Sequence, residues 1–242
     1  MIVSINQPAY LPWLGYFHRI NIADVFVFFN TTQFEKNSMV NRNKIKTPSG
    51  SLMLSVPVNL KDHISKEIRQ IKIADTNWAK KHWKAIELNY RKAQFWNEYA
   101  PSLKKIYEKS YAEIEDVCYE QLMFFTKALG IKTKIIKSCG LSYFCSKKQE
   151  LVLDICKELR TDTYISGALG RDYMNLETFR RQDIKVYYHN YQHPCYKQLW
   201  GKFLPYMSVI DLLFNCGSAS LDIIMSKNIN KNDLLTKNDL YE

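Results

Sequence analysis

The chain has 242 residues, of which 46% are hydrophobic and 24% are charged, as in a globular protein with a buried core. These proportions exclude collagen, low-complexity disorder and a coiled coil. Lys and Arg number 34 against 24 acidic residues, and the resulting charge of +10 favours anionic partners such as phosphorylated metabolites, nucleic acid or an acidic membrane face.

The sequence also indicates a cellular compartment. Its longest apolar run, residues 25–29, is far shorter than the ~20 residues that cross a bilayer, and the N-terminus lacks the features of a signal peptide. We therefore expect a cytoplasmic protein without a membrane span. The 6 cysteines contain no close Cys-x2-Cys pair, which predicts reduced core thiols and no metal site.

The first thirty residues read as a strand, a helix and a second strand. Residues 1–6 are apolar and short, residues 14–22 repeat apolar positions with helical spacing after Pro8 and Pro12, and residues 23–29 are β-branched and aromatic. This order predicts a βαβ unit at the start of the chain.

The next hundred residues contain a polar segment, a predicted hairpin and three predicted helices. Residues 31–48 alternate asparagines with cations, which predicts an exposed ligand loop, and residues 51–57 and 68–73 alternate as the two strands of a hairpin. Helical spacing then predicts three helices, the last ending before Gly130 as at a C′ glycine, over residues 75–93, 95–109 and 112–129.

After Gly130 the strands and helices alternate as in a parallel sheet. We predict strands at residues 132–137, 163–166 and 185–190, and helices at residues 147–159, 173–182, 205–214 and 220–225. The prediction is an α/β protein with a mostly parallel, Rossmann-like sheet and flanking helices. It has one domain over residues 1–226, a helical insertion at about residues 75–130, and a weakly ordered C-terminal tail over residues 227–242.

The first predicted βα turn is the leading place for a ligand, because strand carboxyl ends and helix N-termini converge there in open α/β sheets. Gln7 offers an amide for hydrogen bonding, and Tyr10, Trp13 and Tyr16 offer aromatic faces for stacking. The alternative is a rigid core corner filled by aromatic side chains.

Two further segments could bind anions. Asn41, Arg42 and Lys44 combine amides with cations suited to phosphate oxygens, although a basic run is often only a solvated face. Gly167 and Arg171 follow a predicted strand, where backbone N–H groups can face an anion. That turn lacks the dinucleotide glycine pattern and the Walker lysine, so an ordinary turn is the alternative.

Histidines supply the candidate bases. His82 lies on the first predicted helix of the insertion and could project toward a cleft as a general base, with a buried, hydrogen-bonded histidine as the alternative. His189 lies at the end of the last predicted strand, and His193 lies just beyond it, near Cys195. We interpret both as pocket residues because too few ligands gather there for a metal. Asp211 lies within an apolar helix and predicts a buried carboxylate with a partner.

Five separated motifs occur in order along the chain: QPAYLPWLGYF, NRNKIKTPSG, HWKAIELNY, ISGALGRDY and YQHPCYKQLWGKFLPYMSVIDLLFNCG. Together they resemble the WbqC-like protein family over nearly the whole chain. The resemblance implies a role in the assembly of O-antigen and other surface polysaccharides. It also implies the attachment of acyl or aminoacyl groups, such as glycyl, to amino sugars.

A second resemblance concerns residues 12–16. This segment is similar to the H-x-G-H signature of nucleotidylyltransferases and pantothenate-synthetase-like ligases, with aromatic residues in place of both histidines. The resemblance implies a nucleotidylyltransferase-like (HUP) version of the fold. The histidines that stabilise phosphate charge in those enzymes are absent here.

The leading hypothesis is therefore an N-acyl or aminoacyl transferase or ligase that forms an amide on a nucleotide-linked amino sugar. ATP or acyl-CoA would supply the activated acyl or amino-acid donor, and His82 or His189 would take the proton from the sugar amine. The alternative is a non-catalytic nucleotide or nucleic-acid binder. Because the cations are spread over many predicted helices, we expect no nucleic acid partner, and a homodimer is compatible with the sequence.

Overall fold

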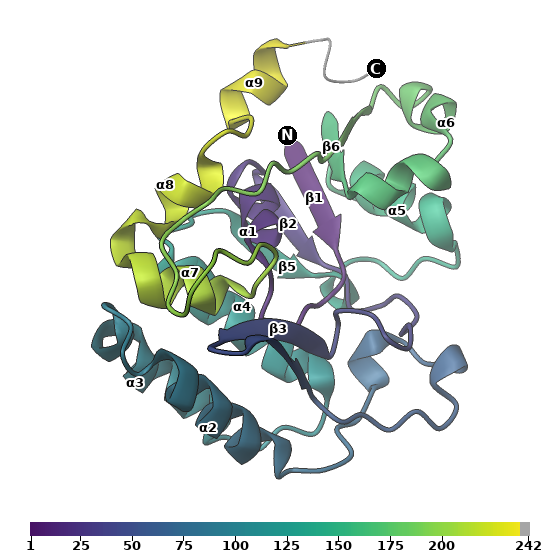
Figure 1. The fold of residues 1–242 in the computed structure, drawn as a ribbon. Helices are drawn as coiled ribbons and strands as arrows, with labels where there is room; N and C mark the ends of the chain where they lie inside the picture. The colour runs from purple at the N-terminus through teal and green to yellow at the C-terminus, as the bar shows by residue number, and fades with distance from the viewer. Residues whose placement is uncertain (238–242) are drawn as a thin grey trace.

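A five-stranded parallel sheet forms the centre of the computed structural model, which describes residues 1–237 (Figure 1). Its strands lie in the order β5-β2-β1-β6-β7 and comprise β1 Ile2–Asn6, β2 Val25–Phe28, β5 Lys134–Lys137, β6 Thr163–Ser166 and β7 Lys185–Tyr188. This arrangement confirms the predicted α/β class with a mostly parallel sheet. The chain leaves β1 toward β2 on one side, whereas β6 and β7 extend the sheet on the other side.

Helices cover both faces of the sheet, as a parallel sheet requires. Phe26 and Phe28 of β2 pack in the cluster that contains α1 (Leu14–Asn21) and α4 (Ile114–Ala128). Val25 and Val27 face the opposite cluster, with α5 (Lys148–Glu158) and α6 (Leu176–Arg180) (Figure 1). Because alternate side chains of β2 enter different cores, this strand reads as a continuous apolar run.

The long segment between β2 and β5 contains a hairpin and three helices. The hairpin pairs β3 (Arg42–Thr47) with β4 (Gly50–Ser55), and the helices are α2 (Trp78–Tyr90), α3 (Trp96–Tyr107) and α4. The three predicted helices of this segment are thus confirmed. The chain turns after α4 at Gly130, whose φ of +72° is a conformation that favours glycine.

The predicted hairpin is wrong in one of its two strands, and part of the predicted loop is a strand. Residues 51–57 coincide with β4, but β4 pairs with β3 and not with residues 68–73. Residues 42–47, expected as part of an exposed loop, form β3, and residues 68–70 form the 3-10 helix Ile68–Gln70 in place of a strand. The reason is that β3 buries polar side chains: Asn43 is 4% exposed and Lys46 is 1% exposed. A strand that buries polar side chains on both of its faces does not show the apolar alternation that predicts strands.

A buried polar network holds β3 to α7 (Val209–Cys216). Asp211 accepts hydrogen bonds from the Tyr90 and Tyr196 hydroxyls at 2.9 and 2.8 Å and from Gln198 Nε2 at 2.7 Å. Lys46 Nζ donates to Gln198 Oε1 at 2.9 Å. Burial raises the pKa of Asp211, and these donors act against that rise. The predicted partnered carboxylate is confirmed.

The C-terminal segment continues through α8 (Ser220–Met225) and α9 (Lys231–Thr236) beside α1 and the sheet (Figure 1). The expectation of a weakly ordered tail is wrong for α9, because Asn230 caps the helix and Leu234 is buried with Ile2 and Tyr187. Residues 238–242 of the predicted tail lie outside the described residues. No helix within residues 1–237 is long and apolar enough to cross a bilayer.

The polar network yields a stability prediction. Asp211→Ala leaves buried hydroxyls without an acceptor and Lys46 without a nearby negative charge, so the free energy of unfolding should fall by about 3–5 kcal/mol. Urea unfolding followed by tryptophan fluorescence measures this change. The matched control is Asp222→Ala on the exposed side of α8, with an expected change within about 0.5 kcal/mol. Equal losses in the two variants would contradict a special role for Asp211.

Candidate functional site

A cavity of about 290 Å³ opens at the carboxyl ends of β1, β6 and β7. It lies where the strand order reverses between β1 and β6, the position at which open α/β sheets bind ligands (Figure 1). The lining residues come from these strand ends, from α1 and from the loop before α7: Asn6, Trp13, Gly15, Tyr16, Arg19, Gly167, Ala168, His189, Asn190, Tyr191 and Tyr206.

Arg19 brings an uncompensated positive charge to this cavity. Its side chain is buried, with 5% of the residue exposed, and its Nη2 makes one long hydrogen bond to the Ile5 carbonyl at 3.4 Å. Among residues 1–237, no carboxylate lies within ion-pair distance and Nε has no hydrogen-bond partner. Burial lowers the pKa of Arg19, yet guanidinium groups remain protonated in proteins.

Two glycines shape the walls of the cavity. A Cβ on Gly167, at the turn after β6, would lie 3.0 Å from Arg19 Nη1, so the glycine makes room for the guanidinium. A Cβ on Gly15 would lie 2.3 Å from the Trp13 indole, so that glycine lets the ring fold over the first turn of α1. Both close approaches depend on the missing side chain.

A histidine pair lies beside Arg19. His18 on α1 and His189 at the end of β7 are joined by a 2.8 Å hydrogen bond between His18 Nδ1 and His189 Nε2, and His18 Nε2 lies 2.9 Å from the Ile229 carbonyl oxygen. Because a carbonyl only accepts, His18 Nε2 carries the proton that it donates to Ile229. Neutral His18 then accepts at Nδ1 from His189 Nε2–H. His189 Nδ1 makes no hydrogen bond within the described chain and can accept a proton.

The surroundings keep both imidazoles neutral. Burial lowers the pKa of His189, and the Arg19 guanidinium and His18 lower it further. The pKa of His18 is lowered by burial and by Arg19, against the hydrogen bond to Ile229. An anion bound beside Arg19 would offset the guanidinium charge and raise the pKa of His189, which makes it a stronger base when the site is occupied.

Four residues that the sequence predicted line the cavity, namely Trp13, Tyr16, Gly167 and His189. Two others lie outside the lining, and one of them, His193, contacts the lining residue Tyr206. His193 Nε2 accepts a hydrogen bond from the Tyr206 backbone N–H at 3.1 Å. The Arg171 guanidinium lies over the Tyr188 ring, 4.9 Å from its centre.

Tyr10 and His82 lie elsewhere, in the core beneath α2. The Tyr10 hydroxyl is 2.7 Å from His82 Nδ1 and 2.9 Å from the Tyr107 hydroxyl. Burial lowers the pKa of His82 to about 4. The structure shows the alternative considered for His82, a buried and hydrogen-bonded histidine outside the cavity lining.

The remaining predicted contacts also lie outside the lining. Asn41 Nδ2 donates to the Val56 carbonyl at 2.8 Å, Arg42 contacts Asn37, and Lys44 belongs to the same hairpin strand. The Gln7 carbonyl accepts a hydrogen bond from the Tyr16 hydroxyl at 3.0 Å, which fixes a lining residue.

Sequence reasoning missed His18 and Arg19, two polar residues inside an apolar helical segment. Their neighbours Phe17 and Ile20 are fully buried, as is nearly every position of α1. A charged side chain in a helix that is otherwise buried on all sides is the signal that could have identified them, because buried charges require a partner.

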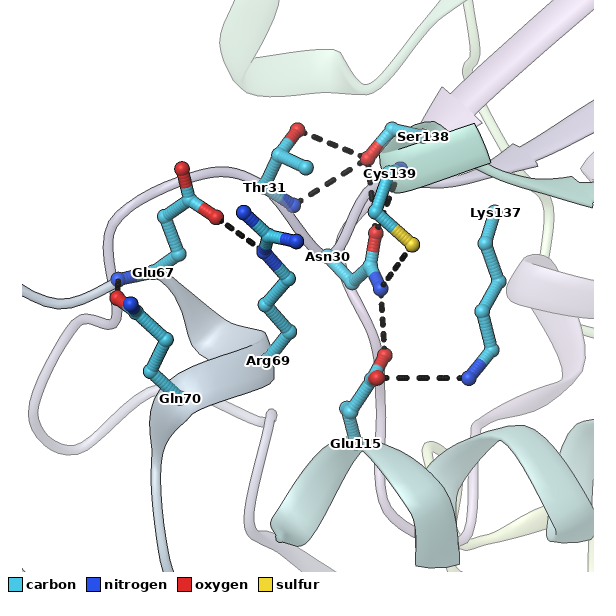
Figure 2. Close-up of polar contacts among 9 residues, drawn as sticks. All are labelled: Asn30, Thr31, Glu67, Arg69, Gln70, Glu115, Lys137, Ser138 and Cys139. Carbon is cyan, nitrogen blue, oxygen red and sulfur yellow. Dashed lines mark hydrogen bonds and ion pairs between the residues drawn. The ribbon is translucent and has the colours of Figure 1, made fainter. Parts of the chain in front are cut away.

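A second polar cluster lies at the carboxyl ends of β2 and β5 (Figure 2). Asn30 Nδ2 donates to Glu115 Oε2 at 2.6 Å and lies 3.3 Å from Cys139 Sγ, while Asn30 Oδ1 accepts from Ser138 Oγ at 3.0 Å. Lys137 Nζ lies 3.4 Å from Glu115 Oε1. Sequence reasoning missed this cluster as well. Because its polar groups have partners, it joins β2, β5 and α4 and differs from the unpaired Arg19.

A larger hollow of about 410 Å³ lies between α6 and the start of β7. It lies away from the carboxyl ends of the strands, and none of the predicted site residues lines it. No group of three or more metal-ligating side chains occurs in the described part of the chain. The cavity beside Arg19 is therefore the site with the clearest chemistry.

Comparison with known proteins gives a family. The sequence profile of the WbqC-like protein family matches residues 7–223. A protein of Mycobacterium tuberculosis named "Uncharacterized protein Rv1507c" is 35% identical over 224 residues, which cover 92% of this chain and 96% of that protein. No solved structure matches the chain.

The neutral histidine pair predicts a pH dependence. The folded-state pKa of His189 lies below the unfolded value of about 6.5, so the unfolded chain binds more protons below that pH. The free energy of unfolding should fall as the pH drops from about 7 to about 5, by up to ~1.4 kcal/mol per pH unit for each such histidine. His189→Gln should flatten this slope in urea unfolding, and an unchanged slope would contradict a neutral His189.

The unpaired guanidinium predicts that Arg19 opposes stability. Arg19→Met removes a buried charge that has no counter-ion and keeps an unbranched side chain, so the free energy of unfolding should rise by about 1–4 kcal/mol. Thermal and urea unfolding measure this change. Arg91→Met at the exposed end of α2 is the control, with an expected change within about 0.5 kcal/mol. A less stable Arg19→Met variant would contradict an uncompensated charge.

Proposed function

The chain belongs to the WbqC-like protein family, and from that premise we propose that it is an N-acyl or aminoacyl transferase or ligase. It forms an amide on a nucleotide-linked amino sugar, in the biosynthesis of O-antigen or another surface polysaccharide. The observation that carries the proposal is a buried, uncompensated guanidinium beside a neutral imidazole in one cavity at the reversal of the strand order.

This pair of groups suits the acylation of an amine. The amine nitrogen attacks the carbonyl carbon of an activated acyl donor, the bond from that carbon to its leaving group breaks, and the leaving group departs with the bonding electrons. The amine nitrogen loses a proton, which His189 Nδ1 accepts. The Arg19 guanidinium holds an anionic oxygen of a reactant and stabilises negative charge near the reacting carbonyl.

His18 acts through His189 and is a positioning residue. Its Nδ1 accepts the His189 Nε2–H, which keeps the lone pair of His189 on Nδ1, and the Ile229 carbonyl in turn fixes the His18 proton on Nε2. When His189 gains a proton, its imidazolium keeps the hydrogen bond to His18. The C-terminal segment that carries Ile229 therefore contributes to the orientation of the base.

The nucleotide of such a substrate extends out of the cavity. A volume of about 290 Å³ is at the lower limit for ligand pockets and suits the reacting groups rather than a whole sugar nucleotide. Tyr206 is 58% exposed at the rim and offers a face for a base, and the exposed Arg171 offers a cation for the diphosphate. ATP or acyl-CoA would provide the activation of the donor.

A substitution tests the role of His189. His189→Gln keeps a donor for His18 but removes the basic nitrogen, so kcat for amide formation should fall about 10²- to 10⁴-fold with little change in KM. The assay incubates the protein with UDP- or dTDP-linked amino sugars and either acyl-CoA or an amino acid with ATP, and detects the amide by mass spectrometry.

His63→Gln is the control, because His63 lies in the 3-10 helix His63–Ser65 and outside the cavity lining. Its kcat should match that of the unmodified protein. An undiminished rate in His189→Gln would contradict the assigned base, and the absence of amide product with every substrate pair would contradict the proposed reaction.

A further inference from the structure

We propose that the cavity beside Arg19 binds a small monocarboxylate, and that the diphosphate of the nucleotide lies outside it. The proposal that a carboxylate binds depends only on the geometry and charge of the cavity. The identification of this carboxylate as the acyl donor, which enters as the free acid, rests on the proposed function.

The lining carries one positive charge, which a ligand with one negative charge would neutralise. Arg19 is the one cationic side chain among the residues that line the cavity, and the lining contains no acidic side chain. A carboxylate would neutralise the guanidinium, whereas a diphosphate would leave at least one negative charge in a poorly hydrated space. Because the net charge of a buried ion and its partner determines much of the desolvation cost, the monoanion fits better.

The hydrogen-bonding groups also match a carboxylate. Arg19 Nη1 makes no hydrogen bond within residues 1–237, and Nη2 makes the one long bond to Ile5, so N–H donors remain for two carboxylate oxygens. A guanidinium and a carboxylate form such paired bonds with complementary planar geometry. The bare Nδ1 of His189 is an acceptor, which repels a second anionic oxygen but can receive a proton from an amine.

The surroundings of the guanidinium limit the space in which a ligand can bind. Arg19 is buried, and the close approach of Gly167 leaves no room for a side chain over Nη1. The cavity volume of about 290 Å³ accommodates an acid such as acetate or glycine together with an attacking amine, but not a whole sugar nucleotide. Phosphate groups that carry a nucleoside would lie outside the cavity, and the exposed Arg171 is the cation proposed for them.

A donor that binds as a free acid has a chemical consequence. Its carboxylate must be activated before amide formation, which a nucleoside triphosphate achieves when a carboxylate oxygen attacks phosphorus and a phosphate-containing group leaves. The amine then displaces the acyl-bound phosphate. Binding of a free carboxylate therefore favours the ligase form of the proposed function over transfer from a thioester.

NMR titration of the full chain tests the inference. The Arg19 Nε–H is buried and unpartnered, so its ¹H–¹⁵N resonance should report on the guanidinium, and it is assigned by its loss in Arg19→Met. Acetate and glycine should each shift this resonance and the His189 ring signals with saturation. Inorganic phosphate at equal concentration should leave them in place.

Two variants test whether acetate binding depends on Arg19. Arg19→Met should weaken acetate binding about 10- to 100-fold, the loss expected for hydrogen bonds to a charged group. Arg91→Met, which removes an exposed arginine at the end of α2, should change acetate affinity by less than about twofold. Because Arg19→Met removes an unpaired charge, it should remain folded, and its retained melting transition confirms this.

The outcomes separate this inference from the proposed function. Saturable shifts by phosphate but not acetate, unchanged acetate affinity in Arg19→Met, or no shift with either carboxylate would overturn the carboxylate site. Amide formation could still proceed in each of those cases and is measured separately. Conversely, carboxylate binding at Arg19 without any amide product would uphold the site and contradict the reaction.

Discussion

The parallel pairing of β1 with β2 on one side and β6 on the other is the constraint from which the site follows. The segments that follow β1 and β6 run toward opposite faces of the sheet, so a gap opens between them at the carboxyl ends of these strands. The gap between them receives α1, the turn at Gly167 and the end of β7, and these three segments contribute Arg19, the glycine wall and His189. The cavity is thus a consequence of strand order before any side chain is considered.

The polar groups of this protein fall into two kinds with different meanings. Asp211 and Asn30 are buried, and each has several partners with good geometry, so they join elements that are distant in sequence. Arg19 is equally buried and lacks such partners. Because a buried charge without a counter-ion points to a ligand more strongly than a fully hydrogen-bonded cluster does, we take the cavity, and not the Asn30 cluster, as the candidate site.

Arg19 and the histidine pair also depend on each other. Burial lowers the pKa of both imidazoles and the guanidinium lowers it further, while the hydrogen bonds from the Ile229 carbonyl through His18 leave one nitrogen of His189 able to accept a proton. An anion that neutralises Arg19 removes part of this effect. In the proposed function, binding of the charged substrate and activation of the base would therefore be one electrostatic event.

Local patterns in the sequence determined much of this architecture. The apolar runs of β1 and β2, the helical spacing of α2, α3 and α4, and the stop at Gly130 each depend on neighbouring residues alone, and all appear in the structure. The motif from Gln7 to His18 correctly indicated a first βα turn, and Trp13, Gly15 and Tyr16 of this turn line the cavity, because strand ends and helix starts are readable without tertiary information.

Only the tertiary structure decided which side chains meet. His18 and His189 are separated by 171 positions, and no local pattern relates them. β3 was unreadable because two of its buried side chains, Asn43 and Lys46, are polar and obtain partners from distant segments. Helix α9 depends on the burial of Leu234 against the sheet. Secondary structure follows from periodicity along the chain, whereas burial of polar groups and the charge of a site depend on partners that folding brings together.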